Sequence, residues 1–97
     1  MKTTKIIELV IISARRIVSE NGTFNPDKIT FNTPLFSSNG IVDSLGLVQL
    51  IADIEEEIYQ ATGKQITIAD EKALSQKISP FRSVSSLAGY IESLLTN

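Results

Sequence analysis

Apolar residues recur every three or four positions in three segments of the chain, which is the spacing of a buried helix face. The pattern predicts helices over residues 2–20, 44–61 and 83–95. The middle segment has the most regular apolar stripe, formed by Leu47, Leu50, Ile51, Ile54 and Ile58. Each helix is therefore expected to bury one face against the others.

Small and polar residues mark where these helices begin and end. Gly22 and Gly63 follow the first two segments, and glycine readily takes the left-handed conformation that closes a helix. Ser83 is the expected N-cap of the last helix. Before it, the sequence predicts an extended piece at 66–68 and a short helix at 69–77.

Residues 23–42 show no helical pattern and include a Ser-Ser-Asn-Gly run. A loop of this length is unusual in a compact domain unless the core holds it. We expect apolar side chains to anchor it, namely Phe24, Ile29, Phe31, Leu35 and Phe36. The loop is also expected to carry the chain from one end of the fold to the other, which would leave the first two helices roughly parallel.

Three longer helices and one short helix, without paired strands, indicate an all-α fold. We expect a four-helix bundle with a long loop between its first two helices. The length of 97 residues predicts a single domain, residues 1–97, and we expect it to act as a monomer.

The composition excludes several classes of function. Without cysteine or histidine, the chain can form no disulfide, Cys/His zinc site or Ser-His-Asp triad. Its net charge of −2 and the lack of a basic face argue against nucleic acid as a partner. Glu8 interrupts the first apolar run and Arg15-Arg16 follows it, unlike a secretory signal, and no run approaches the roughly 20 apolar residues that span a bilayer. We expect a cytoplasmic protein without membrane insertion or a bound metal.

Asp43 and Ser44 stand side by side at the predicted start of the second helix. The first backbone N–H groups of a helix have no partner within it and favour an acceptor oxygen or a negative charge. Either side chain can therefore cap the helix, and this role alone would account for the pair. The position also suits a serine that carries a phosphate ester, because the ester would lie where these donors point.

The second helix is acidic by sequence. No lysine or arginine occurs between Lys28 and Lys64, whereas five acidic residues do: Asp43, Asp53, Glu55, Glu56 and Glu57. A surface of one sign attracts an oppositely charged partner. The alternative is an ordinary solvated helix face.

The segment GIVDSLGLVQLIADIEEEI resembles the signature region of acyl carrier proteins and of related peptidyl and aminoacyl carrier domains. In that family an Asp-Ser-Leu triplet opens the second helix, and its serine receives 4′-phosphopantetheine from coenzyme A. The order of the helices and the segment FRSVSSLAGYI also resemble the family, so the resemblance covers most of the chain. It implies a carrier and not an enzyme, one that holds acyl intermediates as thioesters in fatty-acid, polyketide or other specialised biosynthesis.

Carried over by position, the resemblance implies that Ser44 is the attachment site of 4′-phosphopantetheine and that Asp43 assists recognition by the metal-dependent phosphopantetheinyl transferase. The implied recognition residues for partners are Leu45, Val48, Ala52, Asp53, Glu55, Glu56 and Glu57. The implied partners are that transferase and the enzymes that load and transfer acyl or aminoacyl groups. An acyl chain could lie between the helices, where room would be left by Ala73, Ala88 and Gly89.

Alternatives remain open at the level of the sequence. Gly46 and Gln49 stand where fatty-acid carriers are often acidic, which favours a specialised acyl carrier or an aminoacyl or peptidyl carrier of the D-alanyl or nonribosomal-peptide type. Leu45 and Val48 could simply pack in the core, and the chain could be an unmodified helical interaction module. A hydrolase or transferase that uses the serine directly would lack a base, because Tyr59 lies about four turns along the helix.

Overall fold

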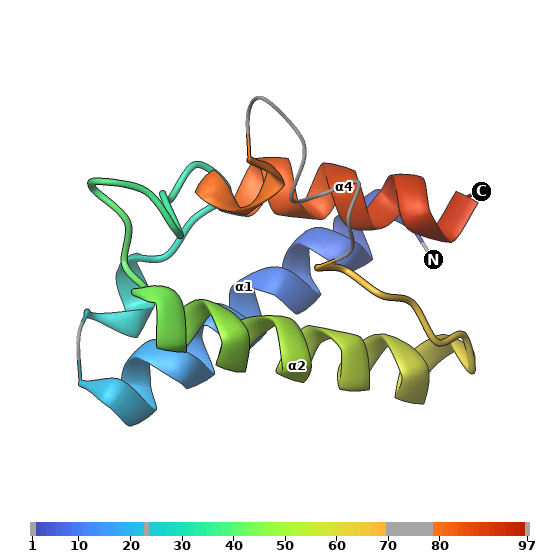
Figure 1. Cartoon of the computed structure of the whole chain (residues 1–97), viewed down its shortest axis with the longest axis horizontal. Helices are drawn as coiled ribbons and strands as arrows, with labels where there is room; N and C mark the ends of the chain where they lie inside the picture. Colours follow the sequence, from blue (N-terminus) through green and yellow to red (C-terminus); the bar gives the residue numbers. More distant parts are fainter. Residues whose placement is uncertain (1, 23, 70–78, 97) are drawn as a thin grey trace.

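The computed structural model describes residues 2–22, 24–69 and 79–96. In these residues the fold contains three α-helices and no strand. Their bounds are Thr3–Asn21 for α1, Ser44–Thr62 for α2 and Val84–Thr96 for α4 (Figure 1). The three longer helices predicted from the sequence and the all-α class are confirmed.

Two short 3-10 helices lie in the connecting segments, η1 at Pro26–Lys28 and η2 at Pro80–Arg82. The extended piece predicted at 66–68 forms no strand, and Ile68 within it is buried. The predicted short helix falls mainly on residues 70–78, which lie outside the described residues.

The helices differ in direction from the sequence-based expectation, because α1 runs antiparallel to α2 and α4 runs parallel to α2 (Figure 1). Two side-chain contacts fix this order: Asn21 at the end of α1 donates to Gln49 near the start of α2 at 3.2 Å, and Arg16 contacts Asp53 farther along α2. The expected parallel arrangement is wrong. The long loop begins and ends at the same end of the fold, where its chain turns back on itself.

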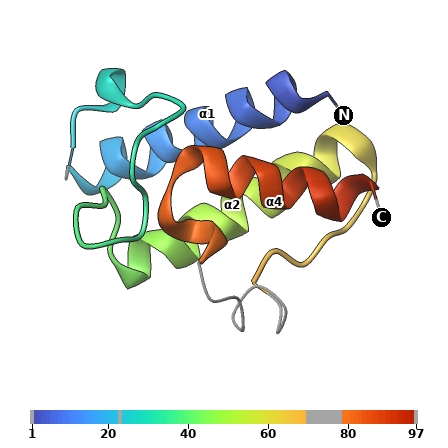
Figure 2. The same cartoon turned by 90° about the horizontal axis from the view of Figure 1, so that it is seen from above.

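The core lies between the three helices. α1 packs against both α2 and α4, and Figure 2 shows it lying beside α4 when the molecule is seen from above. The predicted stripe of α2 is buried at Leu47, Leu50, Ile54 and Ile58, and partly buried at Ile51. The facing positions of α1 and α4 are Ile6, Val10, Ala14, Ile17, Val18, Val84, Leu87, Ala88 and Ile91.

The predicted helix ends are confirmed. Gly22 has φ 66° and Gly63 has φ 73°, both in the left-handed region, and each donates its N–H to the last turn of the preceding helix. Before α4, the Ser83 hydroxyl accepts from the Ser86 N–H at 3.2 Å. The Ser86 hydroxyl in turn accepts from the Ser83 N–H at 3.1 Å, a reciprocal arrangement like that of a capping box.

Backbone hydrogen bonds attach the long loop to the segment before α4. The Leu35 N–H donates to the Arg82 carbonyl at 2.8 Å, and the Phe36 N–H donates to the Phe81 carbonyl at 2.9 Å. The Val84 N–H completes the attachment by donating to the Thr33 carbonyl at 3.0 Å. These bonds join residues far apart in the sequence, so periodicity gave no sign of them.

Only part of the expected apolar anchoring occurs. Ile29 and Leu35 are buried, as predicted. Phe24, Phe31 and Phe36 are exposed, so their predicted anchoring role is wrong. The backbone bonds and the two buried aliphatic residues hold the loop, and the phenylalanine rings lie at the surface.

Candidate functional site

A tight turn in the long loop delivers the chain to the start of α2. The Ile41 N–H donates to the Pro34 carbonyl and the Val42 N–H to the Leu35 carbonyl, each at 3.2 Å. Gly40 lies inside this turn, where a Cβ atom would stand 1.9 Å from the Leu35 carbonyl oxygen. No larger residue fits there without moving the backbone, so Gly40 helps to fix the position of the site.

Asp43 is the N-cap of α2. Its Oδ1 accepts from the Gly46 N–H at 2.8 Å, and its backbone carbonyl accepts from the Leu47 N–H at 2.8 Å. The backbone N–H groups of Ser44 and Leu45 have no partner among the described residues. The first turn therefore keeps two donors and the positive end of the helix dipole available.

Gly46 is buried beneath the cap. A Cβ atom at this position would lie 3.1 Å from the Val42 Cβ and 3.3 Å from Asp43 Oδ1, both closer than ordinary van der Waals contact. The sequence suggested only a weakened helix at Gly46. The structure adds a packing reason, because the two residues that precede the helix, Val42 and Asp43, lie against this position.

Ser44 is exposed at the first position of α2, and its hydroxyl makes no hydrogen bond with the described residues. Leu45 and Val48 are 67% and 64% exposed, and Ala52 is also exposed. Core packing of Leu45 and Val48 is therefore excluded. The three apolar residues follow Ser44 along the outer face of α2, as the sequence pattern predicted.

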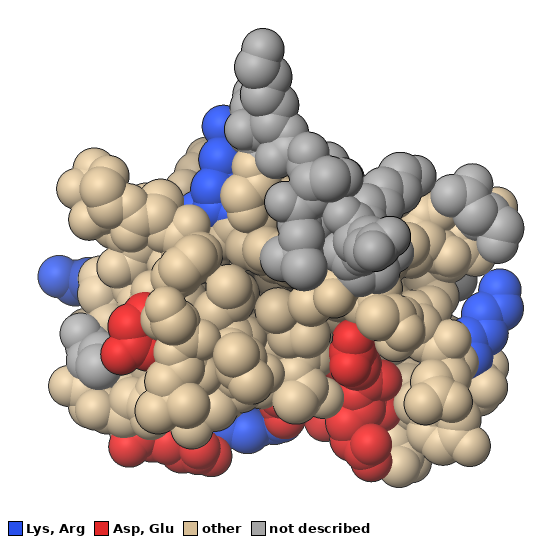
Figure 3. Space-filling view, in the orientation of Figure 1, with Lys and Arg blue, Asp and Glu red and all other residues tan. Residues whose placement is uncertain are grey.

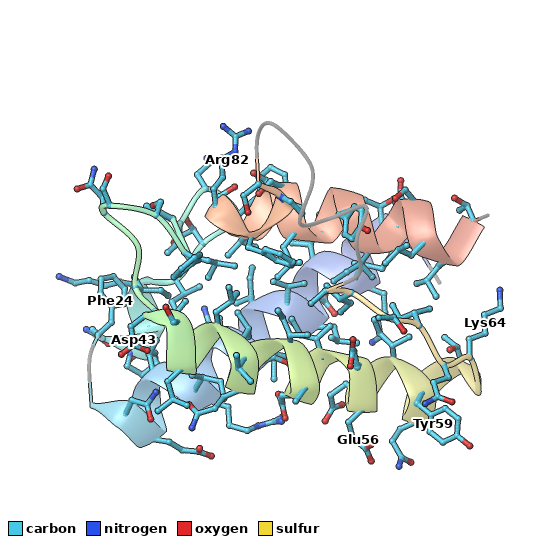
Figure 4. The ribbon with its side chains drawn as sticks, viewed as in Figure 1. Phe24, Asp43, Glu56, Tyr59, Lys64 and Arg82 are labelled. Atoms are coloured by element: carbon cyan, nitrogen blue, oxygen red, sulfur yellow. The ribbon has the colours of Figure 1, made fainter. Side chains whose placement is uncertain are left out.

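An open hollow lies next to Ser44, between the start of α2 and the long loop. Figure 4 shows Phe24 and Asp43 at this end of the molecule. The residues that line the hollow are Asn21, Phe24, Phe36, Ser37, Asn39, Gly40, Ile41, Val42, Asp43, Ser44 and Leu45. Sequence reasoning missed Phe24 and Phe36, because it assigned both rings to the core.

Arg16 on α1 lies against the acidic side of α2. Its Nη1 is 2.6 Å from Asp53 Oδ1, 2.8 Å from Asp53 Oδ2 and 3.6 Å from Glu57 Oε1. The acidic residues of α2 have no basic neighbour in the sequence, but Arg16 lies beside them in the fold. Sequence reasoning missed this contact because it expected the wrong direction for α1.

The other two predicted recognition carboxylates also have contacts within the chain. Glu55 Oε2 accepts from the Ile68 N–H at 2.8 Å, which holds the segment after α2. Glu56 is exposed, and its Oε1 accepts from Gln60 Nε2 at 3.1 Å. Glu56 is the most accessible acidic group of this part of α2.

Among the described residues, no general base lies beside Ser44. None of the residues that line the hollow is a lysine, arginine or tyrosine, and Asp43 is engaged as the cap. Tyr59 and Lys64 lie toward the opposite end of the molecule (Figure 4). The described residues near Ser44 therefore cannot activate its hydroxyl as a nucleophile in the way a serine hydrolase does.

The three residues expected to leave room for an acyl chain do not share one environment in the fold. Ala88 is buried in the core, whereas Gly89 is exposed and a Cβ atom there would meet open space. Gly89 therefore opens no room in the interior. Ala73 lies outside the described residues.

No helix in the described part of the chain combines the length and the apolarity needed to cross a membrane. Comparison with models of protein families, with curated proteins and with solved structures gives no match to this chain.

Proposed function

We propose that this protein is a carrier whose Ser44 is modified with 4′-phosphopantetheine and which presents an acyl group to its partner enzymes. The observation that supports this most strongly is the division of roles at the start of α2. Asp43 takes the cap hydrogen bond, and the adjacent Ser44 hydroxyl remains exposed and unbonded. A serine that served only as a cap would turn its oxygen toward the helix.

The local geometry suits a phosphodiester. In the transfer, Ser44 Oγ forms a bond to the phosphorus that carries the pantetheine group of coenzyme A. The pyrophosphate bond breaks, 3′,5′-adenosine diphosphate leaves, and the serine proton passes to a base of the transferase. The unpaired N–H groups of Ser44 and Leu45 and the helix dipole then favour the negative charge of the ester.

The arm, when attached, supplies the thiol that holds the cargo as a thioester, so the chain itself performs no catalysis. The chain's own residues fix the attachment point and keep it accessible. Partners in this proposal are a phosphopantetheinyl transferase and enzymes that load and transfer acyl groups, with aminoacyl groups as the alternative cargo. The four-helix count, the monomeric state and the cytoplasmic location remain predictions from the sequence.

The proposal is tested by incubating the full chain with coenzyme A, magnesium and a broad-specificity phosphopantetheinyl transferase. Intact mass spectrometry is expected to show the addition of one phosphopantetheine group. Ser44→Ala is expected to abolish the gain, whereas Ser37→Ala, on the rim of the same hollow, is expected to be modified normally. Absence of any gain while a control carrier is loaded would refute the proposal.

The same variants separate the alternatives. If the chain is an interaction module, the Ser44→Ala variant would bind the partner as tightly as the unmodified wild-type chain does. A serine hydrolase would be labelled at Ser44 by a serine-reactive phosphonate. A serine hydrolase gains no support from the described residues, because no base among them lies beside Ser44. An interaction module that used the acidic face of α2 would have to compete with the contacts that Asp53, Glu55 and Glu57 already make within the chain.

A further inference from the structure

A groove with a volume of about 190 Å³ lies between α1 and the last turns of α2. It is remote from Ser44, because Ala61 on its α2 side lies about 25 Å farther along that helix. The attachment of an arm at Ser44 therefore makes no use of this groove. The residues that line it are Lys5, Glu8, Leu9, Ile12, Ser13, Glu57 and Ala61.

Ser13 lies at the base of the groove. It is fully buried although it lines the groove, and its hydroxyl makes no hydrogen bond with the described residues. A buried hydroxyl without a partner costs free energy, which a ligand that bonds to it would recover. Thr33, the other buried polar residue of the described chain, accepts from the Thr30 N–H at 2.7 Å. The missing partner of Ser13 therefore singles out the groove as a ligand site.

The sides of the groove are aliphatic. Leu9 and Ile12 line it from α1 and Ala61 lines it from α2, and we call these three residues the apolar wall. Ile12 is 53% exposed, so the wall is open to water and would gain from being covered. A cavity of about 150 Å³ holds benzene, so the groove has room for an apolar body of about six carbon atoms.

The charges at the groove favour a cation. Among the described residues, two carboxylates and one ammonium group line it. Lys5 Nζ is 3.8 Å from Glu8 Oε2, but both side chains are largely exposed, so this pair is weak. Glu57 Oε1 is 3.6 Å from Arg16 Nη1, which lies closer to Asp53 at 2.6 Å. Figure 3 shows further acidic side chains over the later turns of α2 and along the lower edge of the molecule. Together these groups attract positive charge.

We infer that the groove binds a small primary alkylammonium ion, whose chain covers the apolar wall and whose ammonium group donates to Glu57 and Ser13. An ammonium group has three donors and no acceptor, so it can bond to a carboxylate and a hydroxyl oxygen together. A carboxylate ligand would be repelled by Glu8 and Glu57, and an inorganic cation would gain nothing from the apolar wall. This site does not depend on the modification of Ser44.

The test records proton–nitrogen correlation NMR spectra of the full chain during titration with hexylammonium chloride at constant ionic strength. Saturable shifts are expected at the amides of the groove and not at those around Ser44. For a ligand of this size we expect a Kd on the order of 1 mM. Hexanol, sodium hexanoate and ammonium chloride are each expected to bind at least about fivefold more weakly, because each lacks the charge or the chain.

Two pairs of variants locate the ammonium group. Glu57→Gln is expected to weaken hexylammonium binding by about fivefold. Its control is Glu56→Gln, at an exposed neighbour outside the groove (Figure 4), which is expected to stay within about twofold of the wild type.

The second pair compares Ser13→Ala with Ser19→Ala, since Ser19 is exposed on the same helix and lies outside the groove. Ser13→Ala is expected to weaken binding by about threefold, and Ser19→Ala is expected to leave it unchanged. Without ligand, Ser13→Ala is expected to raise Tm more than Ser19→Ala, because both gain helix propensity but only Ser13→Ala removes an unpaired buried hydroxyl.

Three results would each overturn the inference. They are shifts that do not saturate or that centre outside the groove, equal affinities of the two variants in either pair, and binding of hexanol or hexanoate as tight as that of hexylammonium. Each of these leaves the loading of Ser44 untouched, because loading is measured separately by intact mass.

Discussion

Replacement of Gly46 tests how closely the loop packs on the start of α2. Glycine within a helix is less favourable than alanine by about 1 kcal/mol, so Gly46→Ala would be stabilising if nothing lay near it. The added Cβ would instead stand 3.1 Å from the Val42 Cβ, whereas carbon atoms prefer about 3.5 to 4.0 Å. The contact must therefore open by roughly half an ångström.

Val42 has little freedom to move away. It is buried, and its N–H donates to the Leu35 carbonyl at 3.2 Å, so a shift of Val42 also disturbs the loop. Overpacking of this kind typically costs about 1–3 kcal/mol, which equals or exceeds the gain in helix propensity. We expect Gly46→Ala to change the free energy of unfolding by between zero and about 2 kcal/mol, in the destabilising direction.

Gly89→Ala is the matched control, because Gly89 lies within α4 and a Cβ atom there meets open space. This variant is expected to gain up to about 1 kcal/mol, or roughly 4 °C in Tm. The assay is urea denaturation followed by circular dichroism, with constant m-values required. In a Val42→Gly background, which lacks the Cβ atom at 3.1 Å, Gly46→Ala is expected to recover part of the stabilisation. Equal stabilisation by Gly46→Ala and Gly89→Ala in the wild-type background would refute the packing argument.

Two further predictions concern the segment that positions Ser44. Asp43→Ala is expected to lose about 1 kcal/mol of stability together with the cap, whereas Asp43→Asn is expected to stay within about 0.3 kcal/mol of the wild type, because asparagine caps equally well. Thermal denaturation of the two variants checks this. Equal losses would show that the 2.8 Å bond to Gly46 is not the stabilising feature. Slow loading of a folded Asp43→Asn would assign its charge to transferase recognition. Gly40→Ala is expected to lose at least about 2 kcal/mol, since its Cβ would lie 1.9 Å from the Leu35 carbonyl oxygen. Stability like that of the wild type in the same urea titration would contradict the turn geometry.

The helices were predictable because their signals are local. The α2 stripe from Leu47 to Ile58 repeats within one segment, and Gly22 and Gly63 stand directly after the helices they end. The direction of α1 relative to α2 was not predictable in this way. It depends on how the loop folds back, through bonds such as that between the Leu35 N–H and the Arg82 carbonyl, whose residues are distant in sequence.

The surface around Ser44 was likewise not predictable from the sequence. Phenylalanine in a loop suggested burial, but an apolar residue type does not require it, since much of a folded surface is apolar. Phe36 lies at the surface, whereas its neighbour Leu35 takes the buried position in the core. Arg16 approaches Asp53 across 37 positions of sequence, so composition along α2 alone overstated its negative charge.

The sequence left Asp43 and Ser44 as interchangeable candidates for the helix cap, and the structure removes that ambiguity. One side-chain oxygen suffices for the Gly46 N–H, and Asp43 supplies it at 2.8 Å. Capping therefore explains Asp43 and leaves the identity of Ser44 without a structural cause. A residue at the first position of α2 that is exposed and unbonded could be many types, and several would favour the helix more strongly than serine. An exposed hydroxyl beside unpaired helix donors could, however, carry a phosphate ester without disturbing the fold. Ser44 is thus unnecessary to the fold, and Ser44→Ala is expected to show unchanged stability in urea denaturation together with abolished loading.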